Sequence, residues 1–346
     1  MELRKRQLGS SGMEITTVGF GSWAAGGGGW AFGWGPQDDE VSIAAIRHAV
    51  DLGVNWIDTA AIYGLGHSEE VVGRALAQIP PSRRPFVFTK CGSISDRTRA
   101  YETPVRDLRP ESIRREAEAS LKRLGVERID LFQFHWPDAT GTAMEDSWGE
   151  MVRLIEEGKV RAGGLSNFDT AALERCERVR HVDSLQPPFS LIRRQAATDL
   201  IPWCAAHRTG VIVYSPMLSG LLTDSFSRER VARFAEDDWR RKNPNFSEPN
   251  LSRNIALRDA LKPIAQRHNT TVSVIAVAWT LSWSGITGAI VGARSTAQVD
   301  GWIQAGTIQL TAGDLQEIAR ILRESGAGSG PEIPAASAEP ASARRS

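Results

Sequence analysis

The chain has 346 residues, of which 41% are hydrophobic and 24% charged, a composition typical of a globular protein with a sizeable core. Its 41 basic and 41 acidic residues give a formal net charge of zero, so we expect neither nucleic acid nor a membrane surface as partner. No apolar run follows the charged first residues, so we expect no signal peptide, and the most apolar segment, 272–283, is too short to span a bilayer. The three cysteines share no metal-binding or redox spacing, which predicts a cytoplasmic protein without a bound metal.

Short apolar runs alternate with amphipathic segments along the chain. The apolar runs predict eight strands, at 17–20, 54–58, 86–90, 129–134, 160–165, 182–186, 211–214 and 289–291. The amphipathic segments predict helices at 38–52, 68–78, 111–124, 144–157, 170–179, 196–207, 252–268, 271–283 and 312–323. Strands that alternate with helices predict a parallel sheet, and eight such units without a second domain predict a closed (β/α)8 TIM barrel over residues 1–324.

Four stretches fall outside this alternation. Residues 4–15, with a Gly-Ser-Ser-Gly turn, predict an N-terminal β-hairpin that plugs the bottom of the barrel. Long loops follow the first strand (21–37) and the seventh strand (215–251), and loops of this length are often functional lids. The segment 325–346 is rich in Ala, Ser, Pro and Gly, which predicts a disordered C-terminal tail.

Residues 19–24 formally fit the glycine pattern of a dinucleotide-binding Rossmann domain. That pattern requires a helix to begin at its end, yet four consecutive glycines follow at 26–29. Because the strand count also favours a barrel, we reject this interpretation.

Polar side chains follow the predicted strands at the points where the strands end. In TIM barrels the catalytic groups lie on the loops at the carboxyl ends of the strands. This rim is predicted to carry carboxylate, phenol, ammonium, imidazole, hydroxyl and amide groups, from Asp58, Tyr63, Lys90, His135, Ser166, Asn167, Gln186, Tyr214 and Ser215. Strand capping explains each residue singly, but their collection on one rim favours an active site.

Lys90 is informative because lysine is rare here, with six residues against 35 arginines. A buried ammonium requires an anion, and Asp58 at the next strand end is the candidate. An ammonium also favours a neighbouring phenolate, so we expect Lys90 to lower the pKa of Tyr63 from its usual value of about 10. His135 is placed to donate to a substrate oxygen. The alternatives are a structural ion pair, a packed loop tyrosine and a core histidine.

Several segments together resemble the aldo-keto reductase superfamily, in matching order over residues 3–323. They are Asp-Thr-Ala-Ala-Ile-Tyr-Gly at 58–64, Thr-Lys at 89–90, Gln-Phe-His at 133–135, Gly-Leu-Ser-Asn-Phe at 164–168, Tyr-Ser-Pro at 214–216 and Val-Gly-Ala-Arg-Ser at 291–295. The chain resembles in particular the bacterial stress-protein and potassium-channel β-subunit branches, partly through Asp-Asp-Trp-Arg at 237–240.

The resemblance implies a catalytic tetrad of Asp58, Tyr63, Lys90 and His135. In it, Tyr63 is the general acid that protonates a carbonyl oxygen, Lys90 held by Asp58 lowers the tyrosine pKa, and His135 orients the carbonyl. Charge develops on that oxygen as hydride arrives at carbon, and preorganised donors stabilise this charge more than they stabilise the ground state. The hydride must come from a nicotinamide cofactor, since no side chain supplies one.

The resemblance also implies a cofactor site on the same rim. Amide and hydroxyl groups suit a carboxamide, the Tyr214 ring suits nicotinamide stacking, and Arg294 with Ser295 suits a 2′-phosphate, so we expect NADPH rather than NADH. The implied cofactor-binding residues are Gly21, Ser22, Trp23, Asp58, Ser166, Asn167, Gln186, Tyr214, Ser215, Pro216, Met217, Leu218, Gly220, Leu221, Gly292, Ala293, Arg294, Ser295 and Gln298.

Two departures from the family pattern concern the nucleotide end. After the seventh strand, relatives often carry Gly-Leu-Leu-Thr-Gly-Lys, whereas residues 220–225 read Gly-Leu-Leu-Thr-Asp-Ser, so the lysine is absent and Arg228 and Arg230 are the candidates to replace it. Relatives often carry Glu-Asn for the adenine where this chain has Gly301 and Trp302.

The substrate pocket is expected to involve Trp23, Trp30, Trp34, Tyr63, His135 and Trp136. The tryptophans either line a pocket for a bulky apolar or polycyclic carbonyl or pack the loops together. The sequence therefore predicts an NADPH-dependent reductase of small-molecule aldehydes or ketones. Two other readings stay open: a nicotinamide-binding redox sensor or regulatory subunit with little turnover, and a cofactor-free barrel isomerase or lyase.

Overall fold

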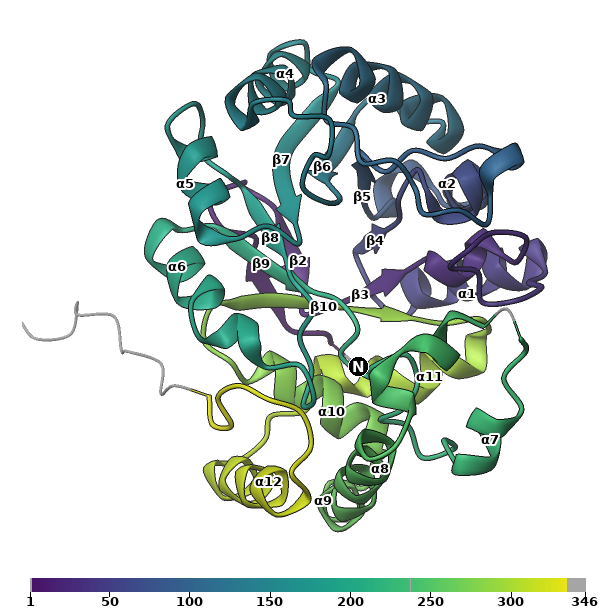
Figure 1. Cartoon of the computed structure of the whole chain (residues 1–346), viewed down its shortest axis with the longest axis vertical. Coiled ribbons are helices and arrows are strands. Elements are labelled where there is room, and N and C mark those ends of the chain that lie inside the picture. Colours follow the sequence, from purple (N-terminus) through teal and green to yellow (C-terminus); the bar gives the residue numbers. More distant parts are fainter. Residues whose placement is uncertain (1, 237, 335–346) are drawn as a thin grey trace, which may run out of the picture.

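Eight parallel strands close into a barrel in residues 2–236 and 238–334, the part of the chain that this computed structural model describes. Around the barrel their order is β10, β3, β4, β5, β6, β7, β8 and β9 (Figure 1). Their bounds are β3 Val18–Gly21, β4 Trp56–Asp58, β5 Phe86–Cys91, β6 Ile129–Phe134, β7 Val160–Ser166, β8 Ser184–Gln186, β9 Gly210–Val213 and β10 Ile286–Gly292. The predicted (β/α)8 TIM barrel is confirmed.

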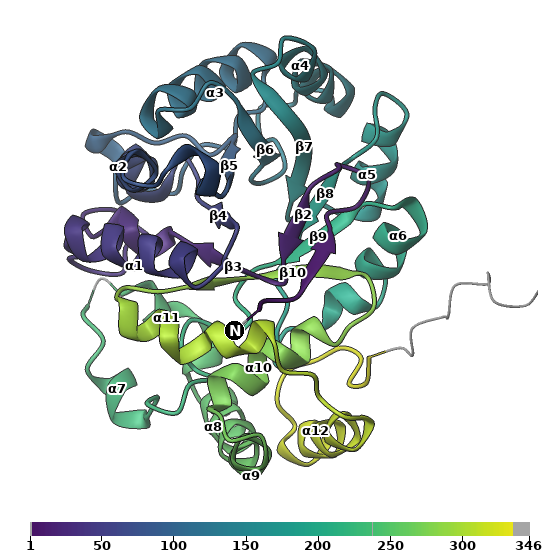
Figure 2. The ribbon, with the colours of Figure 1, turned by 180° about the vertical axis from the view of Figure 1, so that it is seen from behind.

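Helices surround the barrel on its outside (Figures 1 and 2). Their bounds are α1 Asp39–Asp51, α2 His67–Ala77, α3 Pro110–Leu124, α4 Met144–Glu156, α5 Thr170–Glu177, α6 Leu200–His207, α7 Arg228–Ala232, α8 Asn250–Ala260, α9 Lys262–Arg267, α10 Val272–Leu281, α11 Thr296–Ile303 and α12 Ala312–Ser325. Side chains at the first turn set several of these starts: Asp38 accepts from the Val41 amide, and Thr311 and Asp314 form a reciprocal capping box. None of the helices in the described part of the chain is long and apolar enough to cross a membrane.

The barrel interior is filled by large apolar side chains and closed at the bottom by a hairpin. Strands β1 (Lys5–Gln7) and β2 (Glu14–Thr16) pair antiparallel, as predicted. The Trp56 indole is fully buried and donates its Nε1 hydrogen to the Thr16 carbonyl at 2.7 Å. Gly19 makes room for this ring, because a Cβ at that position would lie 2.1 Å from the indole. The hairpin and the interior layer thus fill one end of the barrel and leave the other end for a site.

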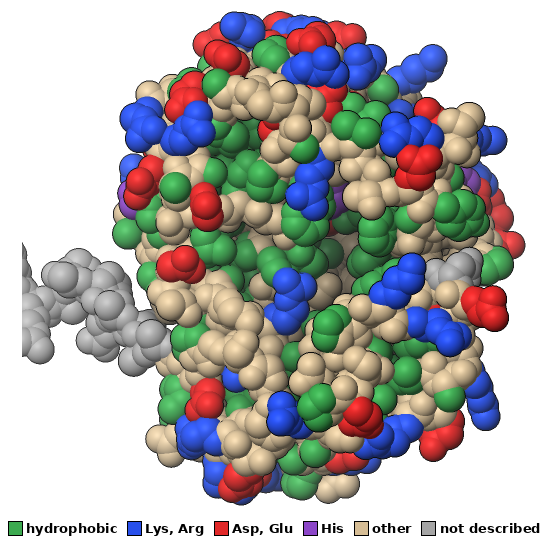
Figure 3. All heavy atoms as spheres, viewed as in Figure 1, with side chains coloured by type: hydrophobic (Ala, Val, Ile, Leu, Met, Phe, Trp, Pro, Cys, Tyr) green, Lys and Arg blue, Asp and Glu red, His purple; other side chains and the backbone are tan. Residues whose placement is uncertain are grey.

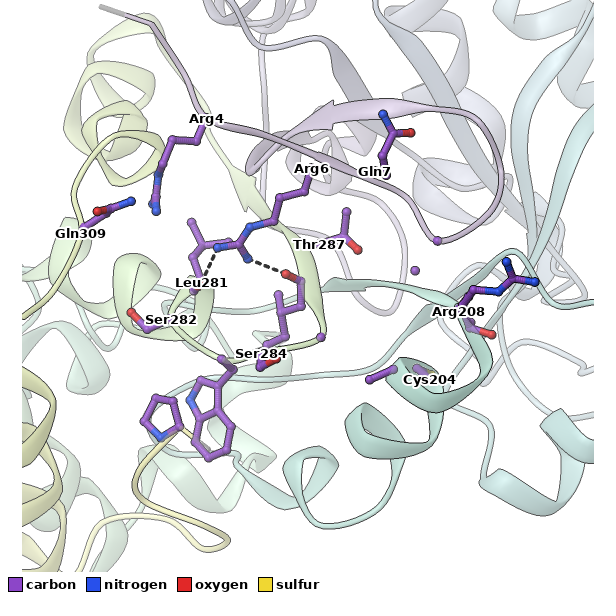
Figure 4. A pocket seen from close by; sticks show the side chains of 18 of the residues that line it. Arg4, Arg6, Gln7, Cys204, Arg208, Leu281, Ser282, Ser284, Thr287 and Gln309 are labelled. Atoms are coloured by element: carbon purple, nitrogen blue, oxygen red, sulfur yellow. Dashed lines mark hydrogen bonds between the residues drawn. The ribbon is translucent and has the colours of Figure 1, made fainter. Parts of the chain in front are cut away.

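A cavity of about 760 Å³ lies at this closed end, between the hairpin, α6, α10 and β10 (Figure 4). Arg6 reaches across it to donate to the carbonyls of Leu281, the last residue of α10, at 2.9 Å and of Ile286 at 2.5 Å. Arg4 donates to the carbonyls of Gly306 and Ile308. Arg6 thus binds the last carbonyl of α10, and Arg4 binds the last carbonyl of the 3-10 turn Gln304–Gly306, so main-chain carbonyl oxygens rather than carboxylates satisfy these two guanidinium groups.

The strand that follows the hairpin does not lead into a nucleotide-binding helix. After β3 the chain forms a short 3-10 turn, Trp23–Gly26, and α1 begins only at Asp39. The glycine pattern at 19–24 is therefore not followed by the helix that a Rossmann domain requires.

The first part of the predicted tail, residues 325–334, packs against the barrel domain. Residues 325–334 are packed: Ala327 is buried, its carbonyl accepts from Arg194, and Gly328 lies so close to Ile192 that a Cβ would meet the Ile192 carbonyl oxygen at 2.0 Å. The prediction of disorder from residue 325 onward is wrong for these ten residues. Residues 335–346 lie outside the described part of the chain.

Candidate active site

A cavity of about 710 Å³ opens at the carboxyl ends of the barrel strands. Figure 3 shows the hollow at the centre of this face, bordered by hydrophobic side chains and by Lys and Arg side chains at its edges. Residues at or just after the ends of β3, β4, β6, β7, β8, β9 and β10 contribute to its wall. The parallel strands thus bring together polar groups that are far apart in the sequence.

Asp58 and Lys90 form a buried ion pair, with Asp58 in this wall and Lys90 behind it. The Lys90 Nζ atom lies 2.5 Å from Asp58 Oδ1 and also donates to the Thr59 carbonyl at 2.9 Å. Gln186 donates to the second carboxylate oxygen at 2.9 Å. Burial lowers the pKa of Lys90 and raises the pKa of Asp58, and the attraction between the two opposes both shifts. The pair is held in one geometry because each charge is costly to bury alone.

Tyr63 lies in a 3-10 turn (Tyr63–Gly66) that follows β4 and presents its ring to the cavity. The ring centroid is 5.2 Å from Lys90 Nζ. Gly64 has φ 61° and touches Gly26, so that a Cβ there would lie 2.2 Å from the Gly26 carbonyl oxygen. This close approach of the two loops fixes the position of the tyrosine.

The pKa of Tyr63 differs from the prediction. Burial, and then the negative charge of Asp58, raise it well above 10. The expected lowering by Lys90 is therefore wrong for this structure, because the lysine charge is directed at the Asp58 carboxylate. The consequence is a phenol that stays protonated at neutral pH, which is the form that a general acid requires.

His135 follows the last residue of β6 and faces Tyr63, with ring centroids 5.7 Å apart. Its Nδ1 atom is buried and has no hydrogen-bond partner among the described residues. Burial, and then the positive charges of Lys90 and Arg106, lower the pKa of His135 well below its usual value. The imidazole is therefore neutral at physiological pH.

A layer of amides and hydroxyls lies beside these groups. Asn167, at φ 65°, donates to the His135 carbonyl at 3.0 Å and accepts from the Tyr214 hydroxyl at 2.7 Å. Ser166 donates to the Gln186 carbonyl at 2.9 Å. These contacts align one face of the cavity wall from β7 to β9.

The two long loops meet over the cavity through three tryptophans. Trp23 stacks on Trp239 with ring centroids 5.5 Å apart, and Trp34 packs edge-on against both, at 5.4 and 5.7 Å. The Arg240 guanidinium lies 4.8 Å from the Trp34 ring centroid and pairs with Asp238. The loop after β9 therefore covers the loop after β3. Asp237 of the same motif lies outside the described residues.

Arginines gather at the far end of the cavity, toward α11. Arg294 donates to the Gln37 side chain and to the carbonyls of Trp34 and Pro36. Arg230 has a pKa lowered by burial and then by the positive charges of Arg240 and Arg294. The Arg294 guanidinium is thus hydrogen-bonded to the loop that follows β3, whereas the Arg230 guanidinium makes no ion pair within the described residues.

Most predicted site residues line this cavity. Those that do are Gly21, Ser22, Trp23, Trp30, Trp34, Asp58, Tyr63, His135, Trp136, Ser166, Asn167, Gln186, Tyr214, Ser215, Pro216, Met217, Leu218, Gly220, Gly292, Ala293, Arg294 and Gln298. Lys90 lies behind Asp58. Leu221 is fully buried in the core, and Ser295 directly precedes α11 and is not among the residues that line the cavity, so their contacts with a cofactor stay predictions.

Several lining residues escaped the sequence-based prediction, notably Arg106, Arg193, Trp239 and Arg240. They come from long irregular loops, in which no strand or helix periodicity indicates the direction of a side chain. The one usable signal was the Asp-Asp-Trp-Arg motif at 237–240, which indicated a branch of the family but not a place in the site.

Comparison with known proteins agrees with this geometry. A model of the Aldo/keto reductase family matches residues 17–323. The chain is 32% identical to aldo-keto reductase YhdN of Bacillus subtilis (92% of this chain, 93% of the relative) and 33% identical to the NADH-specific methylglyoxal reductase of Escherichia coli (93% and 98%). Among solved structures, it resembles glycerol dehydrogenase AKR11B4 of Gluconobacter oxydans, with a TM-score of 0.83, 34% identity, and coverage of 96% and 98%. The chain therefore belongs to the aldo/keto reductase family and is an oxidoreductase acting on carbonyl or alcohol groups.

Proposed function

We propose that this protein is an NADPH-dependent reductase that converts an aldehyde or ketone to the alcohol, with Tyr63 as general acid. The observation that carries the proposal is the buried Asp58–Lys90 pair, 5.2 Å behind the Tyr63 ring, with His135 facing the same phenol. These groups stand at the floor of a cavity of about 710 Å³, within the range of ligand sites in enzymes.

In this proposal each tetrad side chain has a separate role toward the carbonyl oxygen. Tyr63 is protonated and donates its proton to the oxygen as negative charge develops there. His135, kept neutral by burial and by nearby positive charges, orients the carbonyl without bringing a charge of its own. Asp58 holds Lys90 in place behind the phenol, with the ammonium nitrogen 5.2 Å from the centroid of the Tyr63 ring. When bound, the reduced nicotinamide supplies the hydride.

The chain's residues fit such a cofactor at both ends of the cavity. Near the tetrad, Tyr214 offers a ring face, and the side-chain oxygen of Gln186 accepts no hydrogen bond from the described residues, while its side-chain nitrogen donates to Asp58. At the far end, Arg230 and Arg294 offer positive charge to phosphates. Trp302 lines this end with an indole nitrogen that has no partner among the described residues, in the place where relatives carry an asparagine.

The preference for NADPH over NADH rests on this arginine cluster. NADH is the competing cofactor, because the Escherichia coli relative is named as NADH-specific.

For the substrate, aromatic walls favour a carbonyl with a bulky apolar body: Trp23, Trp30, Phe32 and Trp136 line the cavity near Tyr63 and His135.

The test is a binding titration followed by a turnover screen. Quenching of tryptophan fluorescence by NADPH and by NADH gives the two dissociation constants, and NADPH oxidation is then followed with aldehydes, quinones, sugars and polycyclic ketones. Tighter binding of NADPH and oxidation with at least one carbonyl class support the proposal. Stoichiometric binding without turnover across the panel would instead favour a redox-sensing role, and no binding of either nucleotide would contradict both.

A further inference from the structure

The charges that line the active-site cavity are almost all positive. Five of its lining residues are arginines, and the one carboxylate among them, Asp58, is already paired with Lys90. Three of the arginines, Arg230, Arg240 and Arg294, lie together at the nucleotide end. The remaining two, Arg106 and Arg193, lie near the reacting groups. The charge of Arg106 lowers the pKa of His135, and the charge of Arg193 opposes the rise that burial causes in the pKa of Tyr214. A nucleotide cofactor does not explain these two.

Arg106 stands over the ring of Trp136, with its Cζ atom 4.7 Å from the ring centroid. Trp136 in turn stacks beside His135, at 6.4 Å between centroids. A guanidinium that faces a ring keeps its N–H groups, which lie in its own plane, available to another partner. Arg106 therefore presents a positive charge one aromatic ring away from His135.

No described carboxylate lies within ion-pair distance of Arg106, although its neighbours in the same loop are paired. Arg109 binds Asp107 at 2.6 Å, and Arg99 binds Glu102 at 2.7 Å. Arginines elsewhere that lack an acid are satisfied in another way, as Arg6 shows at the closed end of the barrel, where it donates to two carbonyls (Figure 4). The side chain of Arg106 makes neither kind of bond to a described residue.

The segment that carries Arg106 is nevertheless anchored. Val105 and Ile94 exchange two backbone hydrogen bonds of 2.8 Å. The Arg106 carbonyl accepts from the Ala139 amide at 3.0 Å, and the Leu108 amide donates to Asp138 at 2.8 Å. The backbone of Arg106 is thus fixed to the loop that follows β6 and His135, which makes its position at the cavity reproducible.

We propose that the physiological substrate is a carbonyl compound that carries a carboxylate, bound by Arg106 and assisted by Arg193. This inference rests on the proposed reductase function, since it assumes that the carbonyl binds between Tyr63 and His135. A planar guanidinium binds a carboxylate through two parallel hydrogen bonds, and a cavity without a free carboxylate of its own does not repel one. The aromatic walls hold the body of the substrate, and the arginines select its charged end.

The experiment compares two aldehydes of matched shape, 4-carboxybenzaldehyde and 4-methylbenzaldehyde. We expect kcat/KM to be at least about 10-fold higher for the carboxylated aldehyde, and Arg106→Met to lower the ratio of the two kcat/KM values about 10- to 100-fold, mainly through KM of the carboxylated aldehyde. Arg106→Lys should restore part of the preference, because lysine keeps the charge but not the planar fork. Arg109→Met, in the same loop but paired with Asp107 and outside the cavity wall, is the matched control and should change neither substrate.

A second readout needs no turnover. Tryptophan fluorescence, measured in the presence of oxidised cofactor, gives dissociation constants for 4-carboxybenzyl alcohol and 4-methylbenzyl alcohol in wild type and Arg106→Met. Selective binding of the carboxylated alcohol that disappears in the variant supports the inference. Equal kcat/KM for the two aldehydes together with equal binding of the two alcohols would overturn it. Absence of turnover with either aldehyde would count against the reductase function, whereas the binding comparison would still decide on Arg106.

Discussion

Lys90 and Asp58 are held 2.5 Å apart with both side chains buried, and neither has a second partner of opposite charge within the described residues. Removing one partner of such a pair leaves a buried charge without compensation, which typically costs 3–5 kcal/mol. We expect Lys90→Met and Asp58→Asn each to lower the free energy of unfolding by about this amount. The double variant should be less destabilised than the sum, because no charge remains buried. Urea unfolding followed by circular dichroism measures all three, and additive losses would show that the two charges are not coupled.

The protonation states predict a flat pH profile for reduction. A group that acts as an acid loses activity as pH rises through its pKa, and the pKa of Tyr63 lies well above 10. The pKa of His135 lies well below 6.5, so the imidazole stays neutral as pH falls toward 6. We therefore expect kcat/KM for carbonyl reduction to change little between pH 6.5 and 9, in a buffer series of constant ionic strength. A steep decline between pH 7 and 8.5 would mean that the phenol ionises far more readily than its surroundings indicate.

The stacked pair Trp23 and Trp239 predicts slow release of the cofactor. Their rings, 5.5 Å apart, join the two long loops over the cavity, and such a pair contributes about 0.5–1.5 kcal/mol beyond its buried area. Trp239→Ala should therefore speed cofactor dissociation about 3- to 10-fold, as measured by stopped-flow displacement of NADPH. The control is Trp203→Ala, which removes a partly exposed tryptophan that stacks on His207 on α6. Unchanged dissociation in Trp239→Ala would show that the loops close without this contact.

Arg230 should discriminate between the two nicotinamide cofactors. Its guanidinium lines the end of the cavity toward α11, where we propose that the nucleotide binds, and it has no ion-pair partner there within the described residues. We expect Arg230→Met to raise the dissociation constant of NADPH about 10-fold and that of NADH much less, because only NADPH carries a 2′-phosphate. Arg228→Met is the matched control, since Arg228 pairs with Glu248 away from the cavity. Equal losses for both cofactors would place Arg230 at the shared pyrophosphate instead.

The barrel, and the placement of Asp58, Lys90 and His135 on one rim, were predictable because both follow from strand periodicity, whereas the roles of these residues in a tetrad with Tyr63 came from the family resemblance and stay a proposal. A parallel strand that ends in Asp58, Lys90 or His135 places that residue at the rim whatever the rest of the chain does, so the order of the strands alone brought these groups together. The same reasoning could not find Arg106 or Trp239, which lie far beyond the ends of β5 and β9 in loops without a repeating pattern.

The two errors of substance have physical causes. Lys90 was correctly paired with Asp58, but the sequence does not reveal how far burial disfavours phenolate, and burial sets the direction of the Tyr63 pKa. The composition of residues 325–334 is that of a flexible tail. Its glycines, however, adopt positive φ at Gly328 and Gly330 and let the chain lie directly against Ile192 and Arg194.

Rapid-mixing measurement of a single turnover in Tyr63→Phe tests the central claim most directly. With enzyme in excess over NADPH and saturating aldehyde, we expect the rate of NADPH oxidation to fall about 100- to 10,000-fold relative to wild type, because the proton donor is lost. The dissociation constant of NADPH should stay within a factor of about two, since the phenyl ring keeps its packing against Trp23 and Trp30. A Tyr63→Phe variant that oxidises NADPH at the wild-type rate in this single turnover would contradict the assignment of Tyr63 as the general acid.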